Sequence, residues 1–148
     1  MTDTATLEMT RIFAAPQDRV FRHLTETAFL LDWWGPEGTR ITDHNLSFAA
    51  PGPWSATMVG PQGHGATVGG QVRVVDPPHM VELTLSFALE DDMRGPESVI
   101  RFALATTPSG DTMLTLTQSG LNPDHIADMR DKGWASALAR LETLVTAA

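Results

Sequence analysis

Residues 122–147, NPDHIADMRDKGWASALARLETLVTA, decide the fold because they predict one long amphipathic helix. Asn122 offers an N-cap, and Pro123 suits the first helical position. Apolar residues recur at steps of three and four and share their stripe with one arginine: Ile126, Arg130, Trp134, Leu138, Leu141 and Val145. A helix over 123–147 would be about 37 Å long, which is enough to lie across a whole sheet.

Upstream of this helix, residues 39–119 alternate between apolar and polar side chains, as strands of an antiparallel sheet do. Short turns rich in Gly and Pro separate the predicted strands, which are 39–48, 53–60, 66–75, 80–89, 97–106 and 111–119. In the clearest strand, one face carries Val81, Leu83, Leu85 and Phe87, and the other carries Glu82, Thr84 and Ser86. We therefore expect a meander with one apolar face and one wet face.

The N-terminal residues complete the sheet. Residues 6–13 alternate and predict a first strand, with Leu7, Met9 and Phe13 on one face. Pro16 suits the first turn of a helix, and a second short helix is expected over 26–33. The order predicts an α+β protein in which a curved antiparallel sheet of about seven strands wraps around the C-terminal helix. Two short helices follow the first strand.

Composition limits the classes of function. A length of 148 residues suits one domain, so we expect a single domain over 1–148. The net charge of −8 argues against nucleic acid and anionic membranes as partners. The absence of cysteine excludes thiolate catalysis and a Cys-based zinc site. No apolar run approaches the roughly 18 residues of a membrane span, so we expect a cytoplasmic protein.

A series of short motifs also follows a recognisable order. The motifs are Arg11-Ile-Phe-Ala-Ala-Pro16, Trp33-Trp34-Gly35-Pro36, Pro51-Gly-Pro-Trp54, Gly70-Gln-Val-Arg-Val-Val-Asp-Pro-Pro78, Leu114-Thr-Leu-Thr-Gln118 and Gly133-Trp134. Over roughly residues 10–145 the chain thereby resembles the family related to the activator of Hsp90 ATPase, within the START-like and Bet v 1-like proteins. The resemblance implies the helix-grip fold, which agrees with the predicted order of elements. Related folds include polyketide cyclases and aromatases.

The four tryptophans lie in three distant segments. The fold implied by the resemblance would bring several of them into the space between sheet and helix, where aromatic side chains line pockets for apolar ligands. A packed aromatic core is the alternative. The candidate ligand-binding residues are Trp33, Trp54, Met58, Leu85, Phe87, Ile100, Phe102, Leu116, Gln118, Arg130, Trp134 and Leu138. Arg11, Gln118 and Arg130 are the polar side chains on predicted inward faces that could orient a ligand.

No catalytic residue, cofactor or metal site is predicted. The five histidines lack the spacing of a zinc-binding helix, and the nucleophile motif Gly-x-Ser-x-Gly is absent. The glycine-rich stretch 60–65 lacks the Lys and Ser/Thr of a phosphate-binding loop, so we expect a hairpin turn there. The acidic run Glu90-Asp91-Asp92 is expected to be a solvated loop.

Three functions from different classes remain. The first is binding of a small hydrophobic molecule in an internal cavity between the sheet and the C-terminal helix, with no reaction assigned. The second is a cavity enzyme of the polyketide cyclase or aromatase type. The third is a co-chaperone-like module for protein interaction. A homodimer is our default expectation, because closed two-fold dimers are the commonest oligomers.

Overall fold

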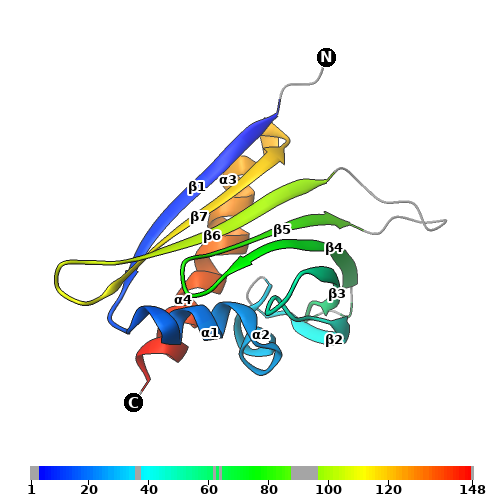
Figure 1. Ribbon diagram of the computed structural model, residues 1–148. Coiled ribbons are helices and arrows are strands. Elements are labelled where there is room, and N and C mark those ends of the chain that lie inside the picture. The colour runs from blue at the N-terminus through cyan, green and yellow to red at the C-terminus, as the bar shows by residue number, and fades with distance from the viewer. Residues whose placement is uncertain (1–3, 36–37, 62, 64, 88–96, 148) are drawn as a thin grey trace.

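The computed structural model describes residues 4–35, 38–61, 63, 65–87 and 97–147 (Figure 1). These residues form a sheet, two short helices and a long C-terminal helical segment. The strands are β1 (Ala5–Phe13), β2 (Arg40–Asn45), β3 (Gly52–Val59), β4 (Gly65–Asp76), β5 (Met80–Phe87), β6 (Ser98–Thr106) and β7 (Thr112–Leu121). The short helices are α1 (Gln17–Thr25) and α2 (Thr27–Trp33).

The sheet has seven strands among the described residues, in the order β1-β7-β6-β5-β4-β3-β2, and every neighbouring pair is antiparallel. Strands β2 to β7 form a meander, because each pairs with the next along the chain. Strand β1 joins the far edge beside β7, where Leu7 pairs with Gln118. Helices α1 and α2 carry the chain from the β1 edge to the β2 edge (Figure 1). The predicted α+β helix-grip fold is confirmed.

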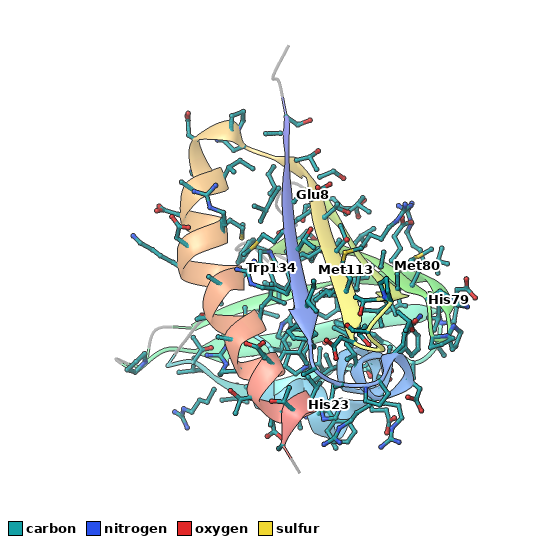
Figure 2. All side chains as sticks on the ribbon, turned by 90° about the vertical axis from the view of Figure 1, so that its left-hand side faces the viewer. Glu8, His23, His79, Met80, Met113 and Trp134 are labelled. Carbon is teal, nitrogen blue, oxygen red and sulfur yellow. The ribbon has the colours of Figure 1, made fainter. Side chains whose placement is uncertain are left out.

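Residues 123–146 form the helical segment that the sheet grips. It begins with a 3₁₀ turn, η2 (Pro123–His125), in which the Asn122 side chain accepts a hydrogen bond from the Asp124 amide at 3.0 Å. It continues through α3 (Ile126–Asp128), the π-helical turn η3 (Met129–Trp134) and α4 (Ala135–Thr146). Figure 2 shows Trp134 on the side of this segment that faces the strands.

The predicted long C-terminal helix is present, and the π turn Met129–Trp134 interrupts its α-helical geometry. A π turn holds one residue more than an α turn, so it changes which residues face the sheet. Arg130, predicted to lie on the apolar stripe, is exposed and pairs with Asp131 at 3.0 Å. Met129 packs against the core in its place.

The core fills the space between the concave sheet and the helices. Its largest fully buried side chains include Phe13, Trp33, Phe48, Trp54 and Phe102. Aromatic side chains thus come from β1, α2, β3, β6 and the connection between β2 and β3. Burial of these large apolar surfaces is the main force that holds the helices on the sheet.

The second face of β5 departs from its predicted wet character. Glu82, Thr84 and Ser86 are 7%, 3% and 3% exposed. The Glu82 carboxylate is covered by two guanidinium groups, from Arg73 of β4 at 2.9 Å and Arg101 of β6 at 2.7 Å. The hydrogen bond from Arg101 is the main cause that lowers the pKa of Glu82 below its ordinary value. Strand β5 is central, so side chains from both neighbouring strands shield its polar residues from water.

Some predictions fall on residues outside the described ranges. They concern the acidic run Glu90-Asp91-Asp92, the end of the predicted strand 80–89, and Pro36 of the tryptophan motif. In the part of the chain that is described, no helix is long and apolar enough to cross a membrane.

Candidate functional site

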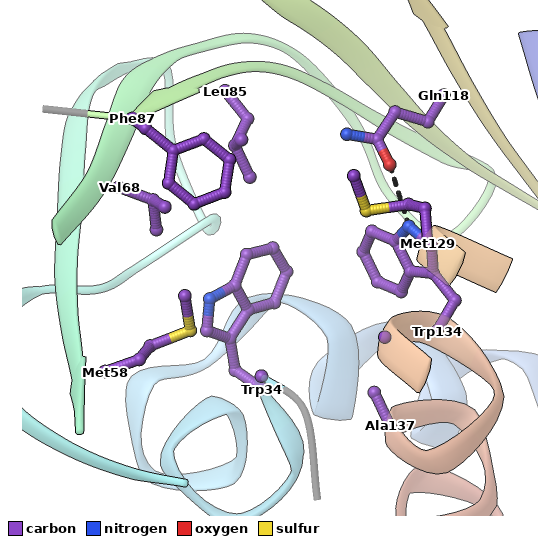
Figure 3. A pocket seen from close by; sticks show the side chains of 11 residues that line it. Trp34, Met58, Val68, Leu85, Phe87, Gln118, Met129, Trp134 and Ala137 are labelled. Atoms are coloured by element: carbon purple, nitrogen blue, oxygen red, sulfur yellow. Dashed lines mark hydrogen bonds between the residues drawn. The ribbon is translucent and has the colours of Figure 1, made fainter. Parts of the chain in front are cut away.

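A cavity of about 110 Å³ lies between the sheet and the C-terminal helical segment (Figure 3). Its walls come from the end of α2, from β3, β4, β5 and β7, and from η3 and α4. The lining residues are Trp34, Gly35, Met58, Val68, Leu85, Phe87, Gln118, Met129, Gly133, Trp134 and Ala137. Apart from the Gln118 amide and two indole N–H groups, these side chains are apolar.

Trp34 stands at the centre of the aromatic packing. Its ring makes edge-to-face contacts with Trp33, Phe48, Trp54 and Trp134, at centroid distances of 5.7, 5.3, 5.5 and 5.7 Å. Edge-to-face pairs place the positive ring edge against the negative ring face. These contacts hold the Trp34 side chain against the cavity.

The backbone on either side of Trp34 is held from α4. The Arg140 guanidinium donates hydrogen bonds to the carbonyls of Trp33, at 3.0 Å, and of Gly35. Gly35 has φ +96°, which favours glycine, and a Cβ there would approach the Met58 Sδ at 3.0 Å. The segment that carries Trp34 is therefore fixed by α4 and fits closely against β3.

Trp54 is fixed to the sheet in an unusual way. Its indole reaches from β3 across β4, and its Nε1 donates to the Thr84 carbonyl on β5 at 2.8 Å. The Gln71 backbone N–H donates a hydrogen bond to Thr84 Oγ1 at 2.9 Å. A Cβ on Gly70 would meet the Thr84 carbonyl oxygen at 2.2 Å, so only glycine fits there. Trp54 thus belongs to the packed floor beneath Trp34 and lies outside the cavity wall.

Gln118 provides the polar point of the cavity. Its side chain is 1% exposed and has partners on both sides. Its Oε1 accepts from Trp134 Nε1 at 2.8 Å, and its Nε2 donates to Ser98 Oγ at 2.9 Å. This chain of bonds links β7 to the helical segment and sets the position of the Trp134 ring (Figure 3).

Trp34 differs from Trp134 in one respect. The residue is 6% exposed, and its Nε1 is buried without a hydrogen-bond partner among the described residues. Buried polar groups in proteins nearly always have a partner, so an exception calls for an explanation.

The structure separates the twelve candidate ligand-binding residues into three groups. Met58, Leu85, Phe87, Gln118 and Trp134 line the cavity. Six others are buried in the core and are absent from the lining: Trp33, Trp54, Ile100, Phe102, Leu116 and Leu138. Arg130 is exposed on the helix surface, and Arg11, expected on an inward face of β1, is exposed as well.

Trp33, predicted to bind the ligand, is buried in the core, and its neighbour Trp34 lines the cavity. Trp33 ends α2, and its Nε1 donates to the His23 carbonyl at 2.8 Å. Trp34 is the C-cap, with φ −66° and ψ 135°. Because this backbone is extended, the direction of its side chain does not follow the helical periodicity of α2. Of the motif Trp33-Trp34-Gly35, the structure therefore places Trp34 and Gly35 in the cavity lining and Trp33 in the core.

Val68, Met129 and Ala137 also line the cavity without having been predicted, and so do two glycines, Gly35 and Gly133. The alternation along β4 could have indicated Val68, since it follows Ala66 at the strand period. Met129 and Gly133 lie in the π turn, which periodicity does not reveal.

The lining offers little for acid–base chemistry. None of the described residues that line the cavity carries a titratable side chain. Over the described ranges, no group of three or more His, Cys, Asp or Glu residues is placed to hold a metal ion. The arrangement suits burial of an apolar surface with one or two directed hydrogen bonds.

Comparison with known proteins places this geometry in context. The sequence matches the profile of the family described as "Activator of Hsp90 ATPase homolog 1-like protein" over residues 14–146. The AHSA1 protein of Silicibacter pomeroyi has a similar structure, with a TM-score of 0.87 and 34% identity over 95% of this chain and 96% of its own. No functionally curated protein matches the sequence.

Two further structures share the fold. A protein of Chromobacterium violaceum has a TM-score of 0.83 and 24% identity, over 97% of this chain and 99% of its own. A protein of Mycobacterium smegmatis has a TM-score of 0.78 and 25% identity, over 99% of this chain and 98% of its own.

Proposed function

Since the chain belongs to the family of activator of Hsp90 ATPase homolog 1-like proteins, a START/Bet v 1-like scaffold, we propose that it binds a small hydrophobic molecule between its sheet and its C-terminal helical segment. The observation that carries the proposal is the apolar cavity itself, which has walls from seven elements and one amide. Binding is non-covalent in this proposal, because the described residues of the lining include no nucleophile.

The cavity volume suggests the size of the buried part of the ligand. A volume of about 110 Å³ approaches that of an engineered apolar cavity of about 150 Å³ that binds benzene. A single ring burying about 150 Å² of apolar surface would gain at most about 4 kcal/mol, equivalent to a Kd of about 1 mM. Tighter binding needs a ligand that extends beyond the cavity. Phe87 lines it and is 43% exposed, so it offers apolar surface at the opening.

The first test is native mass spectrometry of the purified protein. A bound molecule would add a reproducible mass that disappears on denaturation. The same spectrum reports the oligomeric state, so it also tests the proposed homodimer.

A second test uses monocyclic apolar compounds and tryptophan fluorescence, because Trp34 and Trp134 line the cavity. Ala137→Leu adds side-chain volume at the cavity wall and should weaken binding at least tenfold. Ala139→Leu makes the same change at an exposed position of α4 and should bind as the wild type does. Equal binding by the two variants would contradict the proposal.

The rival functions remain predictions. A cavity enzyme of the cyclase or aromatase type would need an acid or base at the cavity, and the described lining supplies none. A co-chaperone-like module would need a binding face. Ile12 and Met113, which pair across β1 and β7 and are 56% and 37% exposed, would belong to such a face.

A further inference from the structure

We infer that the ligand is a neutral, mainly apolar molecule with a hydrogen-bond acceptor that binds Trp34 Nε1. The inference rests on the proposed function and adds the chemical class of the ligand. It follows from an unpaired donor in the cavity wall (Figure 3).

The other three indoles provide an internal comparison. Trp33, Trp54 and Trp134 each donate a hydrogen bond of 2.8 Å from Nε1, to the carbonyls of His23 and Thr84 and to Gln118 Oε1. Trp34 is buried to a similar degree, yet its Nε1 has no acceptor among the described residues. The fold thus provides an acceptor for the indole N–H groups of Trp33, Trp54 and Trp134. It leaves unpaired the indole N–H of Trp34, a residue of the cavity lining.

A buried water is a poor partner for this donor. An ordered internal water usually makes two to four hydrogen bonds to polar groups. The other polar side chains of the described lining are Gln118 and Trp134, and they bond to each other. An acceptor that arrives with an apolar ligand avoids this difficulty, since the remainder of the molecule packs against the apolar walls.

The acceptor is neutral because the cavity provides no counter-charge. No charged side chain belongs to the described lining. Arg140 approaches this region, but its guanidinium is engaged by the carbonyls of Trp33 and Gly35. An unpaired anion buried here would lose its hydration without compensation. A ketone, ester or ether oxygen meets the requirement.

Met58 provides the route to the donor. In Figure 3 the nitrogen edge of the Trp34 indole is turned toward the side of the cavity that Met58 lines. Met58 is only half-buried, and its thioether adapts readily because the side chain has three rotatable bonds. Rotation of Met58 would uncover Nε1 while leaving the aromatic packing in place.

The experiment compares acetophenone with α-methylstyrene, in which a methylene group replaces the carbonyl oxygen. Binding to the ¹⁵N-labelled wild-type protein is followed by the four indole N–H resonances. The Trp34 signal is identified by its loss in Trp34→Phe, or through its contacts with the Phe48 ring if that variant does not fold. Acetophenone should shift the Trp34 indole proton downfield, as hydrogen bonding does, and α-methylstyrene should not.

The affinities give a second readout. Trp34→Phe should weaken acetophenone binding about tenfold more than it weakens α-methylstyrene binding, since only the ketone loses a hydrogen bond. If both compounds bind, shift the indole proton alike and respond alike to Trp34→Phe, the inference is wrong while the proposed function stands. If neither compound binds up to its solubility limit and native mass spectrometry finds no bound molecule, the proposed function is wrong, and the inference falls with it.

Discussion

At the scale of single residues, the structure depends on a few positions where the identity of the side chain admits no alternative. Gly70 allows the Trp54 indole to cross β4 and reach the Thr84 carbonyl. This arrangement couples the motif around Trp54 to the glycine pair Gly69-Gly70, although β3 and β4 are separate in sequence. The motif around Trp54 and the glycine pair of β4 therefore depend on each other through direct contact.

Gly70→Ala should be severely destabilising. Its Cβ would lie 2.2 Å from the Thr84 carbonyl oxygen, which belongs to the backbone of a central strand and cannot move aside. We expect a loss of about 3 kcal/mol or more in the free energy of unfolding, measured by urea denaturation. The control is Gly133→Ala, where the new Cβ would have its nearest contact at 3.9 Å. That variant should be neutral or stabilised by up to about 1 kcal/mol, since alanine favours helices. A Gly70→Ala protein as stable as the control would show that the strands can separate without cost.

Glu82 predicts a dependence of stability on pH. Its pKa is lowered in the folded state, chiefly by the hydrogen bond from Arg101, so the folded carboxyl binds fewer protons than the unfolded one at mildly acid pH. The stabilisation is complete above the ordinary glutamate pKa and is lost as the pH falls through the lowered value. Glu82→Gln should cost about 1–2 kcal/mol at pH 7 and much less near pH 3.

Unfolding curves at the two pH values test this. Glu8→Gln, at an exposed position on β1, should change stability by less than about 0.5 kcal/mol. A cost of Glu82→Gln that stays constant down to pH 3 would contradict the account.

At the scale of elements, the sequence predicts the strands and helices whose apolar residues recur at a regular spacing. The strands and the three helical regions follow from alternation and from steps of three and four, and each predicted element is present with ends shifted by a few residues. Periodicity does not show the π turn, because Met129–Trp134 contains residues that an ordinary α-helix would also accept. Helical periodicity also gives no side-chain direction for a residue beyond the end of a helix. For this reason it does not identify Trp34, at the C-cap of α2, as a lining residue.

The π turn gives an element-scale prediction. Deleting the exposed Lys132 would remove the extra residue and allow a continuous α-helix. Residues before the deletion would then rotate by about 100° relative to α4, and Met129 would leave the cavity wall. Helix content by circular dichroism should be retained, while binding of a monocyclic ligand should fall. Substituting Lys132 by alanine keeps the length of the chain and should leave binding unchanged. Equal binding by the deletion and the substitution would show that the π turn does not shape the site.

At the scale of the whole molecule, the cavity links stability to occupancy. A ligand that binds only the folded state adds about 1.4 kcal/mol at a concentration of about 10 Kd. For a chain of 148 residues this corresponds to a rise in Tm of roughly 3–6 °C. Calorimetry with acetophenone should show the rise for the wild type and for Ala139→Leu. Under the same conditions Ala137→Leu should show little or none, and a full rise in that variant would mean that binding occurs elsewhere.

The order of the strands in the sheet also determines when the sheet can be completed during synthesis of the chain. Strand β1 lies at an edge and pairs only with β7, so it is synthesised before β2–β6 but finds its partner only after them. While the nascent chain leaves the ribosome, each of the strands β2 to β6 can already pair with the next. Residues 5–13 have no partner until residues 112–121 emerge. Closing so long a loop costs entropy and slows folding. The helical segment 123–146 follows β7 in the chain, so it can cover its part of the concave face only after the partner of β1 has been synthesised.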